Sequence, residues 1–109
     1  VIDDPELAPL FGPQSAAEVD VVASVGQGVS GRIDRLAETE TEVLIADFKT
    51  GRPRALDAAL LRQLALYRAA LAPLYPQKRL RGFIVWTPTA TAVEAEEAAL
   101  DEAFAIASR

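Results

Sequence analysis

Three short segments rich in β-branched residues follow one another with little chain between them, and this constrains the fold most. They span residues 18–25 (EVDVVASV), 29–38 (VSGRIDRLAE) and 43–48 (VLIADF), and only GQG and TETE separate them. Links this short join neighbouring antiparallel strands, because a parallel connection needs a dozen residues or more. The first half of the chain is therefore predicted to form an antiparallel meander.

The hydrophobic period changes after GRPRA at 51–55. Apolar residues then recur at helical spacing, with Asp57 as a start signal and Pro73 and Pro76 near the end. The remaining predicted elements are a helix over 56–74, a fourth strand over 80–87, a short fifth strand over 89–96 and a closing helix over 96–107. The fourth strand follows a helix and is expected to run parallel to a neighbour. The predicted fold class is α/β (α+β): a mixed β-sheet with an antiparallel meander, flanked by helices.

A length of 109 residues predicts one domain, with residues 1–17, which hold three prolines, as an irregular lead-in. The start lacks the layout of a signal peptide and the sequence has no Met, so we interpret the chain as a fragment of a larger protein. It has no apolar run near the eighteen residues of a membrane-spanning helix. We therefore expect a cytoplasmic location and no membrane partner.

Cysteine and histidine are both absent, which excludes disulfides and thiolate metal sites. Catalysis would have to use carboxylates, Lys, Tyr, Gln or hydroxyls, with any metal held by oxygen ligands. The net charge is −5, but residues 31–82 hold ten of the eleven basic residues and six of the sixteen acidic ones, a local charge of +4. The middle of the chain is where a phosphate-bearing ligand is expected.

Asp47 and Lys49 interrupt the end of the most apolar predicted strand. A two- or four-residue turn in TETE pairs Glu38 with Val43 either way, and counting back places Asp34 opposite Asp47 on one sheet face, with Lys49 one step further on that face. Facing carboxylates repel unless a cation lies between them, and oxygen ligands favour Mg²⁺ or Mn²⁺. The alternative is a surface ion pair at a fraying strand end.

Gln63 and Tyr67 lie one helical turn apart on the apolar stripe of the predicted helix. A Gln facing the sheet needs a hydrogen-bond partner, or it costs roughly 1–3 kcal/mol. A site on the facing sheet would supply that partner. The alternative is a Gln at the edge of the stripe, bonded to backbone.

Three segments in order, GRIDRL (31–36), ADFKT (46–50) and QLALY (63–67), resemble the motifs of RecB-type nucleases in the PD-(D/E)XK superfamily. The surrounding sequence is most similar to the C-terminal nuclease domain of AddA-type helicase–nucleases. The resemblance implies a restriction-endonuclease-like core and Mg²⁺-dependent cleavage of DNA. It implies that Asp34 and Asp47 are metal ligands, that Lys49 is the catalytic lysine, and that Gln63 and Tyr67 form the helical motif of the active site.

Glu18 matches an acidic residue that often precedes the glycine–aspartate motif in this family, which implies a further metal ligand. A solvated carboxylate at a strand start is the alternative. Arg52 and Arg54 directly follow the predicted site and either contact DNA phosphates or lie in a solvated loop. RecB-type nucleases usually carry a histidine upstream of these motifs. This sequence has no histidine, and we expect that truncation accounts for its absence.

The function predicted from this resemblance is a Mg²⁺- or Mn²⁺-dependent deoxyribonuclease, an exonuclease module of an AddAB/RecBCD-like helicase–nuclease that processes DNA ends in recombinational repair. The parent chain would also be an ATP-dependent helicase with an AddB-like partner subunit, delivering single-stranded DNA to the module. The alternative is a catalytically inactive nuclease-like fold that binds DNA or acts as a scaffold. A stand-alone exonuclease with an iron–sulfur cluster is disfavoured, because the chain has no cysteine.

Overall fold

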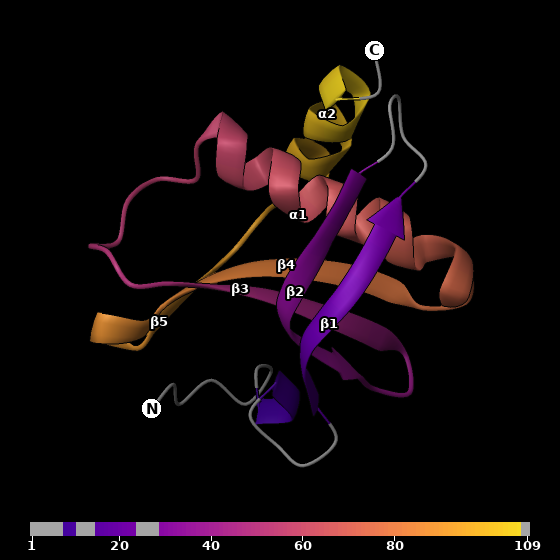
Figure 1. Cartoon of the computed structure of the whole chain (residues 1–109), viewed down its shortest axis with the longest axis horizontal. Helices are drawn as coiled ribbons and strands as arrows, with labels where there is room; N and C mark the ends of the chain where they lie inside the picture. The colour runs from indigo at the N-terminus through magenta and orange to yellow at the C-terminus, as the bar shows by residue number, and fades with distance from the viewer. Residues whose placement is uncertain (1–7, 11–14, 24–28, 108–109) are drawn as a thin grey trace.

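The chain folds into one five-stranded sheet with two helices, seen in a computed structural model that describes residues 8–10, 15–23 and 29–107 (Figure 1). The elements in chain order are β1 (Ser15–Ala23), β2 (Val29–Glu38), β3 (Glu42–Lys49), α1 (Ala58–Leu71), the 3₁₀ turn η2 (Ala72–Leu74), β4 (Arg79–Trp86), the 3₁₀ turn η3 (Thr87–Thr89), β5 (Thr91–Glu94) and α2 (Glu97–Ala107). The predicted number, order and type of the main elements are confirmed.

The strands lie in the sheet in their sequence order, β1-β2-β3-β4-β5. β1, β2 and β3 are antiparallel neighbours, β4 is parallel to β3, and β5 is antiparallel to β4. The meander and the parallel entry of the fourth strand are therefore confirmed. α1 provides the long crossover that the parallel pair requires. The mixed sheet flanked by helices confirms the α+β class.

Some boundaries differ from the sequence expectation. β1 begins at Ser15, three residues before the predicted start at Glu18, and the end of the predicted strand at 24–25 lies outside the described residues. Within the expected lead-in, residues 8–10 form a 3₁₀ turn whose Leu10 is fully buried. Leu10 is buried against the sheet. The prolines around it led us to predict irregular chain, because composition alone does not show that burial.

α1 begins at Ala58, two residues after the predicted start at Leu56. The predicted start signal Asp57 is its N-cap, since the Asp57 carboxylate accepts a hydrogen bond from the Leu60 N–H at 2.9 Å. The helix ends at Leu71, and the chain continues to Leu74 as η2 instead of as α-helix. Pro73 lacks the N–H that another α-helical turn would use. In the part of the chain that the structure describes, no helix is long and apolar enough to cross a membrane.

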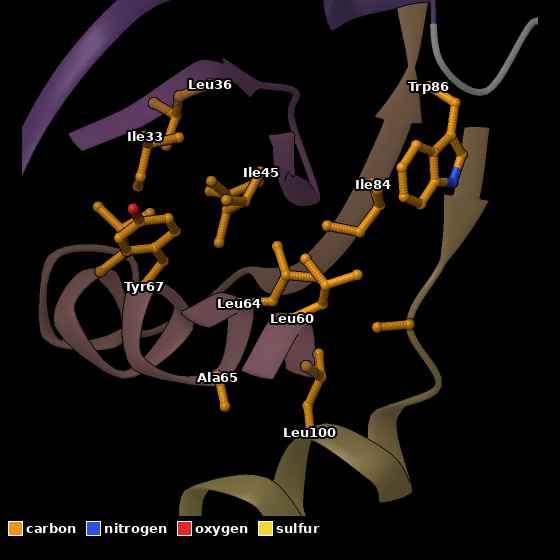
Figure 2. Close-up of a cluster of buried hydrophobic side chains, with 13 residues drawn as sticks. Ile33, Leu36, Ile45, Leu60, Leu64, Ala65, Tyr67, Ile84, Trp86 and Leu100 are labelled. Carbon is orange, nitrogen blue, oxygen red and sulfur yellow. The ribbon is translucent and has the colours of Figure 1, made fainter. Parts of the chain in front are cut away.

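The central strands β3 and β4 are buried on both faces of the sheet. On one face, sheet residues pack against α1 and α2 in the cluster of Figure 2, which includes Ile33, Ile45 and Ile84 from strands, Leu60, Leu64 and Tyr67 from α1, and Leu100 from α2. Trp86, at the end of β4, belongs to this cluster and is 2% exposed. On the other face, Leu10 packs with Ala37, Leu44, Ala46, Phe83 and Val85.

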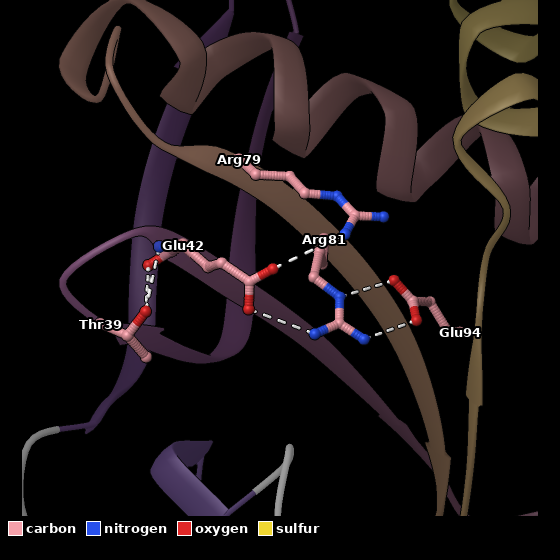
Figure 3. A network of polar contacts seen from close by, with 5 residues as sticks. All are labelled: Thr39, Glu42, Arg79, Arg81 and Glu94. Carbon is pink, nitrogen blue, oxygen red and sulfur yellow. Dashed lines mark hydrogen bonds and ion pairs between the residues drawn. The ribbon is translucent and has the colours of Figure 1, made fainter.

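The β3, β4 and β5 strands are also joined by a polar network around Arg81, whose side chain is only 10% exposed (Figure 3). Its guanidinium donates two hydrogen bonds to the Glu94 carboxylate, at 2.8 and 2.7 Å, and a third to Glu42 at 3.2 Å. Its guanidinium also lies over the Phe83 ring, with Cζ 5.2 Å from the ring centre. This paired geometry lowers the pKa of Glu94, chiefly through the hydrogen bonds from Arg81.

We expect Glu94→Gln to lower the free energy of unfolding by about 1 kcal/mol near pH 7, since the amide replaces a charged, two-point acceptor in a partly exposed pair. Because the pKa of Glu94 is lowered on folding, its contribution is present above the pKa of an unfolded Glu and is lost as the pH falls through the folded value. Urea unfolding between pH 3 and 7 measures the difference. Glu102→Gln, at an exposed position on α2, is the matched control, and an equal loss in both variants would contradict the prediction.

Candidate active site

The candidate site forms where β2 and β3 stop sharing a ladder. Paired residues run from Glu38–Val43 to Arg35–Ala46, so the predicted register is confirmed. The next pair in this count would be Asp34 with Asp47, but there the side chain of Asp34 takes over: its Oδ2 accepts a hydrogen bond from the Phe48 N–H at 2.8 Å. A carboxylate thus replaces a backbone carbonyl at the last rung and lies against the end of β3.

Asp47 lies on the helix-facing side of β3. Every second residue of a strand points to the same face, and Val43 and Ile45 belong to the cluster that packs against α1. It is 4% exposed and is the buried charged residue among those the structure describes. Lys49 follows on the same side, and its Nζ lies 3.0 Å from the Asp47 Oδ2. The lysine side chain is 33% exposed, so it lies between the buried carboxylate and solvent.

The electrostatics of Asp47 are unfavourable to its charge. Burial raises the pKa of Asp47 most, and a hydrogen bond with the neighbouring Asp34 carboxyl raises it further, while Lys49 lowers it. The net direction is upward, so the ion pair with Lys49 does not offset the cost of burying this carboxylate beside another. The Asp47 Oδ2 is also buried without a well-aligned hydrogen bond, although Lys49 is close to it.

This arrangement fits a hard divalent cation. Two adjacent carboxyl groups, one with a buried oxygen that lacks a hydrogen bond, are oxygen donors of the kind that Mg²⁺ and Mn²⁺ prefer. Within residues 8–10, 15–23 and 29–107, no group of three or more His, Cys, Asp or Glu is placed to hold a metal. Mg²⁺ commonly binds through one or two carboxylates and completes its shell with water and substrate oxygens, so the pair suffices.

Glu18 stands apart from this pair. Its neighbours in β1 pair with the neighbours of Asp34 in β2, Ala17 with Arg35 and Val19 with Ile33. Glu18 itself adopts a left-handed backbone, with φ of 56°, and its side chain is exposed and interacts electrostatically with Arg32. It is not grouped with Asp34 and Asp47 in a three-carboxylate cluster. Its role as a metal ligand stays a prediction.

Gln63 and Tyr67 are brought together, but toward β2. The Gln63 amide donates to the Tyr67 hydroxyl at 3.0 Å, and that hydroxyl donates to the Arg32 carbonyl at 3.0 Å. Gln63 thus has the partner that its position requires, and the partner is a tyrosine hydroxyl. Tyr67 thus contacts β2 at Arg32, two residues before Asp34, and Gln63 contacts Tyr67. Their catalytic role stays a prediction.

The loop after Lys49 carries the two predicted DNA-contacting arginines. Arg52 is exposed. Arg54 pairs with the Asp57 carboxylate at 3.1 Å and lies over the Trp86 ring, 5.6 Å from its centre. The loop thus leads directly from Lys49 to the start of α1 with exposed positive charge, and contact of either arginine with DNA is untested by this geometry.

Two parts of the site were not assigned roles from the sequence. Gly31 lies against Tyr67, and a Cβ there would meet the ring Cε1 at 3.0 Å. The Phe48 backbone N–H holds Asp34. A glycine inside a strand is a signal of close approach by another group, which would have pointed to Gly31. A backbone donor carries no sequence signal.

Comparisons with known proteins agree with this fold. The family model of the PD-(D/E)XK nuclease superfamily matches residues 7–108. Eleven chains of solved structures match, among them the crystal structure of SSO0001, with 17% sequence identity and a TM-score of 0.53. That match covers 91% of this chain and 54% of the other, so this chain spans about half of its length. No curated protein matches.

The family match covers nearly the whole chain, and the chain therefore belongs to the PD-(D/E)XK nuclease superfamily. The mixed sheet with flanking helices is consistent with the restriction-endonuclease-like core of that superfamily. The likeness to SSO0001 supports the fold alone.

We expect Asp47→Asn to raise the free energy of unfolding by roughly 1 kcal/mol at pH 7 with EDTA present. The reason is that Lys49 does not fully compensate the buried carboxylate of Asp47, and the amide of Asn carries no charge. The pKa of Asp47 is raised on folding. Its contribution to stability is therefore fully present below the pKa of an unfolded Asp, and it is lost as the pH rises through the pKa of the folded state. The advantage of the variant should therefore vanish toward pH 4. Denaturant titrations at several pH values measure this.

Asp20→Asn is the matched control, since Asp20 is an exposed partner of Arg32. It should not stabilise the protein at any pH. A loss of stability in Asp47→Asn at pH 7 would show that the pair with Lys49 outweighs burial.

Proposed function

We propose that this chain is a metal-dependent deoxyribonuclease module that hydrolyses DNA phosphodiester bonds at the Asp34–Asp47–Lys49 site. The observation that carries the proposal is the convergence of these three side chains, from two strands, at the end of the β2–β3 ladder. Membership in the PD-(D/E)XK nuclease superfamily supports the same reaction class.

The roles follow from charge and position. Asp34 and Asp47 would hold Mg²⁺ or Mn²⁺, which when bound polarises a phosphoryl oxygen and lowers the pKa of water. The Lys49 Nζ lies 3.0 Å from the Asp47 Oδ2 and its side chain is partly open to solvent, where it would stabilise negative charge that develops on a phosphate. Arg52 and Arg54, in the exposed loop that follows, would bind neighbouring phosphates of the strand.

Within this class, we assign the chain to the exonuclease module of an AddAB/RecBCD-like helicase–nuclease that processes DNA ends in recombinational repair. The support is the order and spacing of GRIDRL, ADFKT and QLALY and their resemblance to RecB-type nucleases. A helicase in the parent chain would deliver single-stranded DNA, so the module itself can carry a net charge of −5. An AddB-like subunit would complete the heterodimer.

The test of activity is cleavage of end-labelled single-stranded DNA with Mg²⁺ or Mn²⁺. We expect Asp47→Ala and Lys49→Ala each to lower the rate at least about 100-fold, the usual scale for loss of an electrostatic group at the reaction centre. Glu40→Ala, in the exposed turn at the other end of β3, is the control and should retain the wild-type rate.

Calorimetric titration with Mn²⁺ separates the enzyme from the inactive, DNA-binding alternative. An enzyme requires wild-type metal binding that Asp34→Ala and Asp47→Ala abolish. DNA binding without metal binding or cleavage would instead establish the scaffold. Helicase motifs in the parent sequence, and copurification of a second subunit with ATP-dependent unwinding, test the AddAB-like context.

A further inference from the structure

Asp34 contacts β3 through its carboxylate, which accepts a hydrogen bond from the Phe48 N–H, and its backbone is not among the paired positions of the sheet. On the β1 side the ladder pairs Ala17 with Arg35 and Val19 with Ile33, and Asp34 is absent from the paired positions between them. On the β3 side the ladder ends at Arg35. Asp34 is therefore a strand residue that lies outside the paired positions of both neighbours, although its carboxylate must be held to a fraction of an ångström for metal chemistry.

α1 supplies a different support just before Asp34. Tyr67 is 6% exposed, and its hydroxyl donates to the Arg32 carbonyl at 3.0 Å. A hydroxyl has one proton to donate and can accept another hydrogen bond. The Gln63 amide makes that second bond at 3.0 Å and so fixes the direction of the Tyr67 proton toward β2.

The fit between Tyr67 and β2 depends on a missing side chain. A Cβ on Gly31 would lie 3.0 Å from the Tyr67 Cε1 and 3.2 Å from its hydroxyl oxygen. Contacts at 3.0 Å require one of the groups to move. Glycine at this position lets the ring lie directly on the strand, so Tyr67 contacts two consecutive residues, Gly31 by packing and Arg32 by hydrogen bonding.

We propose that Tyr67 is the positioning residue for Asp34: it holds β2 from α1 through Gly31 and the Arg32 carbonyl, with Gln63 orienting its hydroxyl. This rests on the proposed function for its catalytic meaning, because it assumes that Asp34 is a working carboxylate. It reassigns Gln63 and Tyr67 from contact with substrate to support of the strand that carries Asp34. No part of it requires either side chain to reach the metal or the DNA.

The Phe48 amide reports the position of Asp34 without metal or substrate, since it donates to the Asp34 Oδ2 at 2.8 Å. Hydrogen exchange of this amide is compared with that of the Ala95 amide, which directly follows β5 and donates to the Gly82 carbonyl of β4 at 2.9 Å. We expect Tyr67→Phe to raise the ratio of Phe48 to Ala95 exchange by about tenfold, through loss of the hydroxyl that holds Arg32.

Tyr75→Phe is the matched control, since it removes the other tyrosine hydroxyl of the chain, at the end of η2. Its exchange ratio should equal that of wild type. Gly31→Ala should raise the ratio as Tyr67→Phe does, because it pushes the ring from the strand. An unchanged ratio in Tyr67→Phe, including an equal rise at both amides from general destabilisation, overturns the proposal.

Mn²⁺ titration of the same proteins separates this proposal from the proposed function. If wild type binds Mn²⁺, Tyr67→Phe should weaken binding several-fold while Tyr75→Phe does not. If wild type binds no Mn²⁺ but the Phe48 ratio rises, the positioning role stands and the metal site fails. If wild type binds Mn²⁺ and the ratio is unchanged, the positioning role fails and the metal site stands.

Discussion

The site depends on one constraint: the pairing of β2 with β3 ends at Arg35 and Ala46, next to Asp34 and Asp47. Had the ladder continued, the Phe48 N–H would bond to a backbone carbonyl. It bonds instead to the Asp34 carboxylate, and this brings Asp34 within hydrogen-bonding reach of Asp47. In Figure 1, β1 and β2 cross the nearly horizontal β3 and β4 steeply, as expected for strong twist at this point.

The charged residues at the two ends of β3 differ in how well they are paired. At the first end, Glu42 meets Arg79 and Arg81, and Arg81 is in turn held by Glu94 (Figure 3). At the last end, Asp47 has one lysine, an acidic neighbour and a buried oxygen without a hydrogen bond. The paired end stabilises the sheet, whereas the other end holds a buried carboxylate that is incompletely bonded and lowers stability. Such a contrast is typical of functional sites.

The sequence predicted the meander, the parallel fourth strand and the Glu38–Val43 register, because short links and alternating apolar residues leave few other arrangements. It also placed Asp47 and Lys49 on one face, since they are two residues apart in a strand. It did not predict that Gln63 would bond to Tyr67, or that the Arg32 carbonyl would accept from Tyr67, because these contacts depend on how α1 crosses the twisted sheet. Leu10 was missed for a similar reason: its burial depends on the sheet face it covers.

Glu18 has a consequence for anyone who would redesign β1. An L-residue in the left-handed region costs roughly 1–2 kcal/mol, and a glycine would relieve that cost, yet here the position carries a long acidic side chain in the middle of a strand. Relaxing the backbone would mean giving up a carboxylate one strand away from Asp34. At Glu18, a variant that relieves the backbone conformation therefore loses the carboxylate, and a variant that keeps the carboxylate keeps the unfavourable backbone.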